Sequence, residues 1–291
     1  MNSSTLMKIV AFSAVMTGCS TLGAGSPAAS DTSSTAHAPG VPARPATAAA
    51  AAEGEVLKYG RAMKSPMTLE VYGLNGHVRA ALASADVAEV RATKRASRGD
   101  PASQRVVVKE RPEGTVVCVL YADEADDACK PGRAQDRHDR RDDAEVRIDF
   151  ELRVPPAIAL RADTLNGDIE ARELQSDVQA HTLNGVLRLA TTGRITGNTL
   201  NGAIVATALG PGEPDPIELQ TLNGKIEMRL ADRSSFDVDA STMRGHVTSD
   251  FALPAAASGY GPSVVRGPVG GGGAALHMKT MNGDIEVKRV Q

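Results

Sequence analysis

A four-residue phrase, Thr-Leu-Asn-Gly, returns along the second half of this 291-residue chain. Successive copies between Gly167 and Gly245 lie 17 to 22 residues apart, and a step of 38 residues leads to the last copy at Gly283. A period near 20 residues predicts an array of stacked units. The longer step leaves room for one more, degenerate repeat around 267–273. The four perfect copies and three variants begin at Thr164, Thr182, Thr199, Thr221, Thr242, Thr280 and, much earlier, Gly73.

Aliphatic residues at fixed distances from each phrase indicate that a strand leads into it. They occupy the fourth position before the Thr and the fourth after the Leu or Met, and alternation before the Thr has the period of a strand. The apolar residues occupy alternate positions before Asn-Gly and the opposite set of alternate positions after it. This change indicates a turn at Asn-Gly, because Gly and often Asn adopt positive φ angles. These aliphatics are Leu69, Leu160, Val178, Ile195, Ile217, Val238 and Leu276 before the phrase, and Val78, Ile169, Leu187, Ile204, Ile226, Val247 and Ile285 after it.

Two all-β folds fit this pattern. Asn-Gly could close a two-residue β-hairpin, or it could form the corner of a parallel β-solenoid whose corners stack ~4.8 Å apart. The residue after the Thr position is Leu or Met in all seven copies, which predicts that it is buried and favours the solenoid. We therefore expect a single-stranded parallel β-helix with rungs of 17–22 residues. The predicted turn residues are Asn75, Gly76, Asn166, Gly167, Asn184, Gly185, Asn201, Gly202, Asn223, Gly224, Gly245, Asn282 and Gly283.

The scarcity of aromatic residues agrees with thin rungs. Aromatics make up 3% of the chain and Trp is absent, so the core must consist of small aliphatics. Before the regular repeats of 161–291, the sequence predicts less evenly spaced strands, which we expect to form irregular first coils and a cap over 56–160. The expected domain thus spans 56–291. Its strands before the repeats are predicted at 68–72, 88–92, 105–109, 115–121 and 145–154.

The N-terminal residues predict export and a lipid anchor. One Lys precedes an eight-residue apolar run, Ile9 to Met16, and a Cys follows at position 19, which is typical of a bacterial lipoprotein signal peptide over 1–18. Cys19 would then carry the acyl chains and bind the membrane. Ser20 favours the outer membrane, with the leaflet left open. The alternative is an ordinary secretory signal with an incidental Cys. Residues 19–55, rich in Ala, Pro and Ser, are predicted to be a disordered tether.

The two remaining cysteines, Cys118 and Cys129, predict a disulfide, because an exported protein matures in an oxidising compartment. Zinc binding by the pair is the alternative that we weighed. The charged segment 123–145 is expected to be a solvated loop, with a cation or partner site as its alternative. The sequence contains no run of 18 apolar residues, so we expect no membrane-spanning helix. The net charge of −3 gives no reason to expect a nucleic-acid partner.

The strand that ends in Leu152-Arg153-Val154-Pro155-Pro156, followed by Thr164-Leu165-Asn166-Gly167-Asp168-Ile169-Glu170 and its repeats, resembles the bacterial DUF4097 family. These β-strand-repeat proteins are labelled adhesins and are related to head-GIN-domain proteins. The resemblance covers 56–291 and implies a right-handed parallel β-helix in the cell envelope. It brings no catalytic residue with it.

We expect no enzymatic activity, no metal and no cofactor. The sequence contains no nucleophile elbow, His-Glu-x-x-His motif or phosphate loop. A β-helix polysaccharide-active enzyme would need paired carboxylates, and stacking in chain order gives no carboxylates on adjacent rungs at the position of Glu170. The leading hypothesis is a lipid-anchored adhesin or scaffold that binds an unknown protein or surface ligand. The alternative is a periplasmic stress or assembly accessory that binds another envelope protein.

Overall fold

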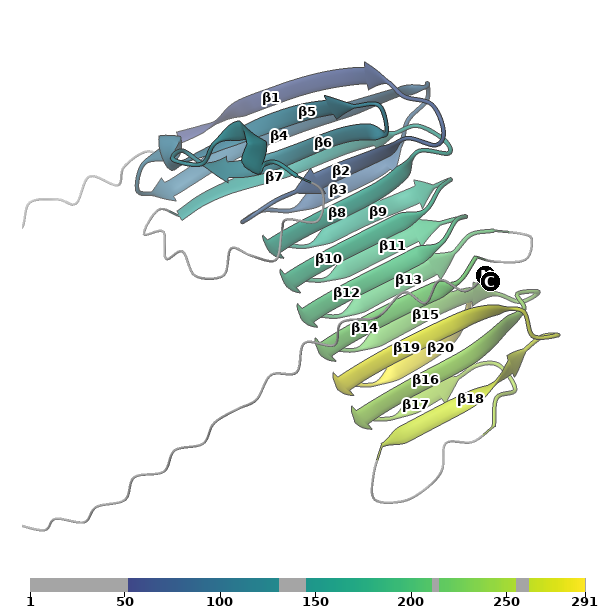
Figure 1. The fold of residues 1–291 in the computed structure, drawn as a ribbon. Helices are drawn as coiled ribbons and strands as arrows, with labels where there is room; N and C mark the ends of the chain where they lie inside the picture. Colours follow the sequence, from purple (N-terminus) through teal and green to yellow (C-terminus); the bar gives the residue numbers. More distant parts are fainter. Residues whose placement is uncertain (1–51, 131–144, 211–214, 255–261, 291) are drawn as a thin grey trace, which may run out of the picture. The chain divides into compact units, whose positions relative to one another are not determined.

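The computed structural model describes residues 52–130, 145–210, 215–254 and 262–290, which form two mostly parallel β-sheets (Figure 1). Ten strands in each sheet lie within these described residues. Two three-residue 3₁₀ helices, η1 (Pro101–Ser103) and η2 (Asp126–Ala128), accompany them. Neither helix could span a bilayer, and the described part holds no longer one. The predicted signal peptide, Cys19 and most of the tether lie outside the described residues.

The first sheet, sheet A, contains the strands that follow the Asn-Gly turns. In spatial order its strands are β1 (Ala52–Ala62), β4 (Val87–Arg98), β7 (Glu145–Val154), β3 (Val78–Leu82), β9 (Ile169–Leu174), β11 (Leu187–Thr191), β13 (Ile204–Ala208), β15 (Ile226–Ala231), β20 (Ile285–Val290) and β17 (Val247–Ser249).

The second sheet, sheet B, contains the strands that lead into the Asn-Gly turns. In spatial order its strands are β18 (Ser263–Val269), β16 (Phe236–Arg244), β19 (Ala274–Asn282), β14 (Ile217–Asn223), β12 (Ile195–Asn201), β10 (Val178–Asn184), β8 (Ala159–Asn166), β2 (Thr68–Tyr72), β6 (Gly114–Tyr121) and β5 (Gln104–Arg111).

Each regular repeat contributes one strand to each sheet. In sheet B, β8, β10, β12 and β14 pair in parallel with Thr aligned on Thr. In sheet A, β9, β11, β13 and β15 pair in parallel with Ile169, Leu187, Ile204 and Ile226 aligned. The two strands on either side of an Asn-Gly turn therefore lie in different sheets. The hairpin alternative is wrong, since it requires them to pair with each other.

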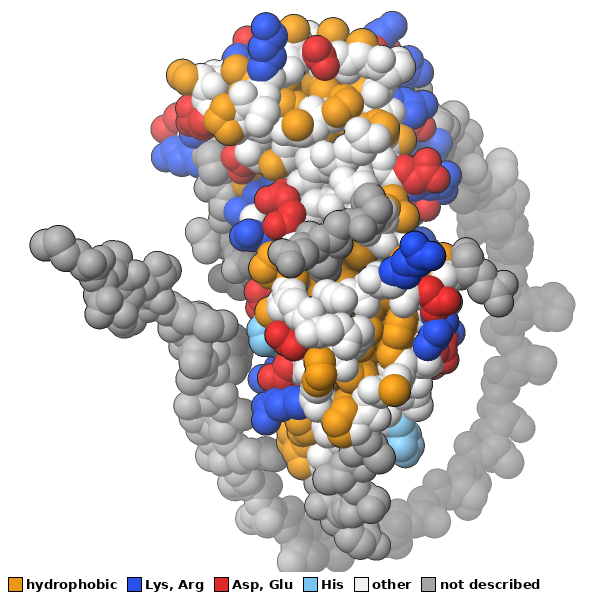
Figure 2. Space-filling model, turned by 90° about the vertical axis from the view of Figure 1, so that its right-hand side faces the viewer, with side chains coloured by type: hydrophobic (Ala, Val, Ile, Leu, Met, Phe, Trp, Pro, Cys, Tyr) orange, Lys and Arg blue, Asp and Glu red, His pale blue; other side chains and the backbone are white. Residues whose placement is uncertain are grey.

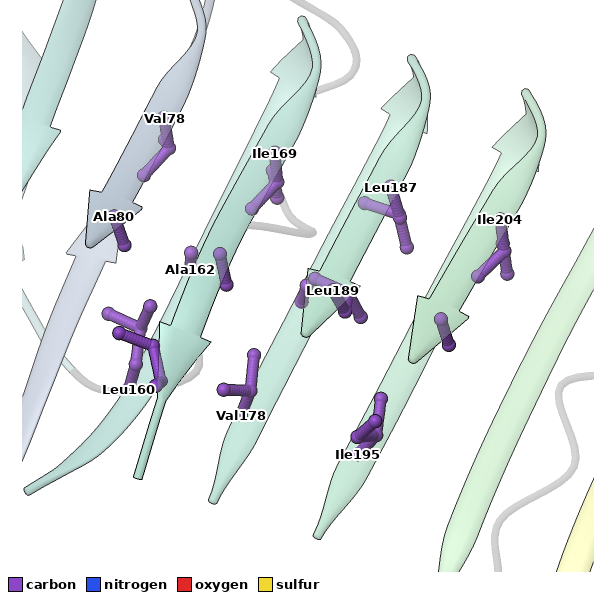
Figure 3. Packing of buried hydrophobic residues seen from close by; sticks show 14 of the residues in the cluster. Val78, Ala80, Leu160, Ala162, Ile169, Val178, Leu187, Leu189, Ile195 and Ile204 are labelled. Carbon is purple, nitrogen blue, oxygen red and sulfur yellow. The ribbon is translucent and has the colours of Figure 1, made fainter. Parts of the chain in front are cut away.

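The aliphatic positions around each phrase fill the space between the sheets (Figure 3). Leu160, Val178 and Ile195 of sheet B face Ile169, Leu187 and Ile204 of sheet A, and all six are 1% exposed or less. Large rings are few in this core: Phe150 and Phe236 are its buried phenylalanines, the first before the regular repeats and the second at the start of β16. Burial at these positions follows the predicted pattern, except that Val247 at the short strand β17 is only half-buried.

The last repeat does not stack in chain order. β19 lies between β14 and β16, and β20 lies between β15 and β17, so the chain returns to occupy a place between two earlier repeats. The expected additional repeat near 267–273 is wrong. Those residues belong to β18, which runs antiparallel to β16 at the sheet edge, and to the glycine turn that leads into β19. A further repeat would need one strand in each sheet, whereas this segment supplies only β18, to sheet B.

The early copy at Gly73 packs directly on the first regular repeat. β2 pairs in parallel with β8, and β3 pairs with β9, although about ninety residues separate them in the chain. The intervening segment adds β4 and β7 to sheet A and β5 and β6 to sheet B, and β1, which precedes β2 in the chain, completes sheet A at this end. The pairs β1–β4, β4–β7 and β5–β6 are antiparallel. Strands occupy all five stretches predicted there. β1 begins at Ala52, inside the stretch predicted to be tether.

Candidate functional site

The Asn-Gly corners are held by a threonine from the neighbouring repeat. Each Thr hydroxyl is buried and donates a hydrogen bond to a corner carbonyl of the next rung, at 2.8 to 3.1 Å in five copies. Thr182 Oγ1, for example, donates to the carbonyl of Gly167 at 3.1 Å. Thr164 reaches the carbonyls of Leu74 and Gly76 at 3.2 and 3.4 Å. These threonines are therefore core residues that satisfy the turn backbone.

The corner glycines are required because successive corners approach backbone to backbone. A Cβ atom added at Gly185 would overlap the carbonyl group of Gly167, and one at Gly202 would overlap that of Gly185. The same relation continues at Gly224 and Gly283. The corner amides are also paired: Gly202 N donates to the carbonyl of Asn223 at 2.9 Å. No residue with a side chain fits this spacing without moving one rung away from the next.

The predicted turn asparagines form one continuous ladder along this edge. Each side-chain Nδ2 donates to the Oδ1 of the neighbouring asparagine at 2.7 to 2.8 Å. The ladder is continuous where β2 packs on β8 and where β19 packs on β14, although these strands are far apart in the chain. At one end the ladder stops, because Arg244 occupies the position next to Asn282 where the repeat pattern would place an asparagine. In spatial order the ladder is Asn75, Asn166, Asn184, Asn201, Asn223 and Asn282.

The Leu or Met after each Thr faces outward in the regular repeats. Its predicted burial is confirmed for Leu74, which is 2% exposed, and is wrong for the exposed Leu200, Met243 and Met281. Leu165, Leu183 and Leu222 are half-buried, and Leu165 packs against the core. Because the strand continues through the asparagine, an inward Thr places the next side chain outward. The fractional exposure is 38% at Leu200, 48% at Met281 and 53% at Met243. We call the outward set the apolar row: Leu165, Leu183, Leu200, Leu222, Met281 and Met243.

The outer faces of the two sheets differ in charge at the middle repeats. On β10 and β12, sheet B presents Gln179, Thr196 and Asn198 beside the apolar row. The strands β14, β16 and β19 add the charged residues Glu218, Asp237, Asp239 and Lys279. Sheet A presents ion pairs, such as Arg172 with Glu170 at 2.8 Å and Arg229 with Glu227 at 2.7 Å. At the edge opposite the Asn-Gly corners, charged side chains gather along the margins and the middle is largely uncharged (Figure 2).

Two carboxylates of sheet A stand side by side, which the sequence prediction had excluded. Glu227 and Glu286 are cross-strand neighbours because β20 pairs with β15. Burial would raise the pKa of Glu227, but hydrogen bonds from Arg229 and Lys288 outweigh it and lower that pKa. Hydrogen bonds from Lys225 and Lys288 lower the pKa of Glu286. Both groups are therefore held ionised, whereas a glycosidase acid requires a raised pKa.

A buried polar group lies on the outer side of sheet B, where no motif indicated one. Asp163 is 3% exposed; its Oδ2 accepts from Arg161 Nε at 3.1 Å, and its Oδ1 has no protein partner. Burial raises the pKa of Asp163 despite the charges of His181 and Arg161. Burial also lowers the pKa of His181, whose Nδ1 lies 3.1 Å from Asn198 Nδ2. With Asp163 and His181 together, the cluster still lacks a third ligand, and the described residues contain no group of three metal-binding side chains.

The predicted disulfide between Cys118 and Cys129 is present. It fixes η2 over the outer face of β6, in a small cluster with Tyr72, Val107 and Leu120. Zinc binding by this pair is wrong, since neither sulfur is a free thiolate. Arg105 Nη1 joins Asp126 Oδ1 at 2.5 Å within the charged segment. The greater part of that segment, 131–144, lies outside the described residues.

No protein-family model matches the chain, and no curated protein matches it. Three solved structures are similar at low identity. A "putative cell adhesion protein" from Clostridium sporogenes has a TM-score of 0.43 and 8% identity, covering 80% of this chain and 99% of its own. A "putative adhesin" from Bacteroides fragilis has a TM-score of 0.36 and 10% identity, covering 80% and 96%. One from Parabacteroides merdae has a TM-score of 0.27 and 9% identity, covering 82% and 97%.

Replacing a corner glycine tests the close approach of the rungs. Gly202→Ala should lower the free energy of unfolding by about 3 kcal/mol, because its Cβ must displace the Gly185 carbonyl. Gly54→Ala is the matched control, since nothing lies within 4 Å of a Cβ there. Urea denaturation of both variants measures the difference, and equal stabilities would contradict the corner geometry.

A pair of aspartate substitutions tests which leucines are buried. Leu200→Asp should cost about 1 kcal/mol or less, because the side chain faces outward. Leu219→Asp, on the neighbouring strand β14 and 0% exposed, should cost more than ~4 kcal/mol or prevent folding, since it buries an unpaired carboxylate. Thermal unfolding distinguishes the two. Comparable losses of stability in the two variants would mean that Leu200 is buried and would contradict its outward position.

Proposed function

We propose that this protein is a non-enzymatic, lipid-anchored adhesin or scaffold of the bacterial cell envelope. We further propose that its two sheets form a single-stranded β-solenoid of the DUF4097 type. The lipoprotein-like start with Cys19 supports anchoring, and the repeated strands support the solenoid assignment. Attachment at the outer membrane is part of the same proposal and rests on Ser20. The partner is an uncharged or apolar surface of another macromolecule.

The apolar row is the observation that carries the binding role. An outward position that served only the turn could hold any strand-forming polar residue, yet it is Leu or Met in every repeat. Strands of one sheet lie ~4.8 Å apart, so these side chains make a continuous ridge. Asn198 and Gln220 lie beside the ridge in its middle rungs, so an uncharged partner surface could approach without desolvating an ion pair. Repeats that present an extended face commonly bind along it.

The arrangement of carboxylates supports a role without catalysis. Glu227 and Glu286 are the adjacent pair on sheet A, and Lys225 and Lys288 bridge them at 2.7 to 3.5 Å. Both are held as carboxylates, so neither supplies the protonated acid that glycoside cleavage requires.

An assembly accessory that binds another envelope protein is the second candidate. The edge strands β1, β5, β17 and β18 each pair on one side only, so a partner strand could add to one of them. β18 is the poorest of these edges because Pro268 lacks an amide hydrogen.

Accessibility in whole cells separates the two candidates. Cells expressing the full chain are incubated with an antibody against the folded domain, before and after permeabilisation of the outer membrane. Labelling of intact cells is expected for an adhesin. Labelling only after permeabilisation would remove the adhesin role and leave the periplasmic accessory.

The apolar row is tested in the same cells by their attachment to a protein-coated surface. Leu200→Asp with Met281→Asp should reduce attachment at least fivefold, at equal surface expression. Ala231→Asp, an exposed residue away from the row, is the control and should leave attachment unchanged. Equal attachment by all three proteins would exclude the apolar row as the binding face.

A further inference from the structure

A groove lies on the outer face of sheet A, on the other sheet from the apolar row. It has a volume of 960 Å³ and is lined by residues of β1, β4, β7, β3 and β9. Figure 1 shows these strands at the end of sheet A where the antiparallel strands join the regular repeats. Its lining contains five basic side chains and three acidic ones. Lys58, Arg79, Arg91, Arg153 and Arg172 are the basic residues, and Glu89, Glu151 and Glu170 are the acidic ones.

The strand register explains the hollow. Ala81 of β3 lies directly between Arg153 of β7 and Arg172 of β9. Gly60 of β1 is a second small residue in the same cross-strand row, opposite Glu89. Small residues at these two positions leave space between the long side chains that flank them. The hollow is thus built by sequence at particular positions of the sheet.

Three guanidinium groups surround Ala81. Arg153 and Arg172 flank it on the two neighbouring strands, ~10 Å apart by the strand spacing. Arg79 precedes it by two residues on the same strand and therefore projects from the same face. The three residues lie on three neighbouring strands of one sheet, so the spacing of their Cα atoms is fixed by strand pairing.

Two of these arginines carry unused charge. Within the part of the chain that the structure describes, neither Arg79 nor Arg153 has a carboxylate at ion-pair distance, although both have glutamates on adjacent strands. Arg172 is held by Glu170 through its Nε at 2.8 Å, which leaves its terminal nitrogens able to donate elsewhere. Arg91, at the far side of the groove, is already paired with Glu55 at 3.1 Å. Donor capacity is therefore concentrated around Ala81.

We propose that this groove binds a phosphate group over Ala81, with Arg79, Arg153 and Arg172 as its ligands. A guanidinium matches phosphate oxygens with two parallel hydrogen bonds. One arginine satisfies both oxygens of a carboxylate, whereas a phosphate monoester presents three terminal oxygens, which share its negative charge, to three donors. The group could belong to inorganic phosphate, to a lipid headgroup or to a phosphorylated glycan. The site is independent of the proposed adhesin role.

Calorimetric titration of the full-length protein measures its binding of inorganic phosphate and of glycerol phosphate. Co-sedimentation measures its binding to vesicles that contain phosphatidate. Arg79→Gln with Arg153→Gln should weaken phosphate binding at least tenfold. Ala81→Leu keeps every charge but fills the hollow, and it should weaken binding to a similar extent. Arg188→Gln, on the same face at β11 but outside the groove, is the control and should bind like the unaltered protein. Melting temperatures establish that each variant is folded, and Arg153→Gln alone replaces the double variant if that one does not fold.

If the unaltered protein binds the soluble phosphates and Ala81→Leu abolishes this binding, the site is supported. If binding is confined to the vesicles and Ala81→Leu abolishes it, the phosphate belongs to a lipid. Undiminished binding in Ala81→Leu would reduce the effect to general surface charge and overturn the proposal. Absence of binding to all three probes would also overturn it.

Discussion

The close backbone approach of successive Asn-Gly corners is the constraint on which the remaining structure depends. A carbonyl from one rung occupies the space where the next corner residue would carry its Cβ, so glycine is required at each rung. The glycine amide, the threonine hydroxyl and the asparagine side chain each bond to the neighbouring corner. Each of these bonds contributes about 0.5–1.5 kcal/mol. Repeated in every rung, they allow only one alignment of one repeat on the next.

A fixed register determines the chemistry of both sheets. With Thr on Thr, each aliphatic lies on the equivalent aliphatic above and below, so the core is a continuous slab of Leu, Ile, Val and Ala. Outward positions are aligned in the same way, which gathers the Leu and Met side chains into the apolar row. At β3 the register places Ala81 between two arginines. One alignment therefore produces the core, the apolar row and the basic groove.

Local pattern in the sequence was sufficient for the strands, the turns and the interior residues, because each depends on near neighbours. It was insufficient for Leu200. Seven apolar residues at one position suggested burial, but the strand continues past the Thr and turns this side chain outward. Chain order also failed at the last repeat. Insertion of β19 between β14 and β16 depends on contacts between distant residues, and it brings Glu227 beside Glu286. The groove is likewise invisible in sequence, since Ala81, Arg153 and Arg172 meet only through pairing.

Hydrogen exchange at the corner glycines measures the stacking most directly. The amides of Gly185, Gly202 and Gly224 donate to carbonyls of the next rung at 2.9 to 3.0 Å, although they lie in turns at the molecular surface. If the corners lock the rungs together, these three amides should exchange as slowly as those of the buried strand residues Ile195 and Ile217, at a rate set by global unfolding. Exchange of the glycine amides on the time scale of an open surface turn, with the strands still protected, would contradict this account.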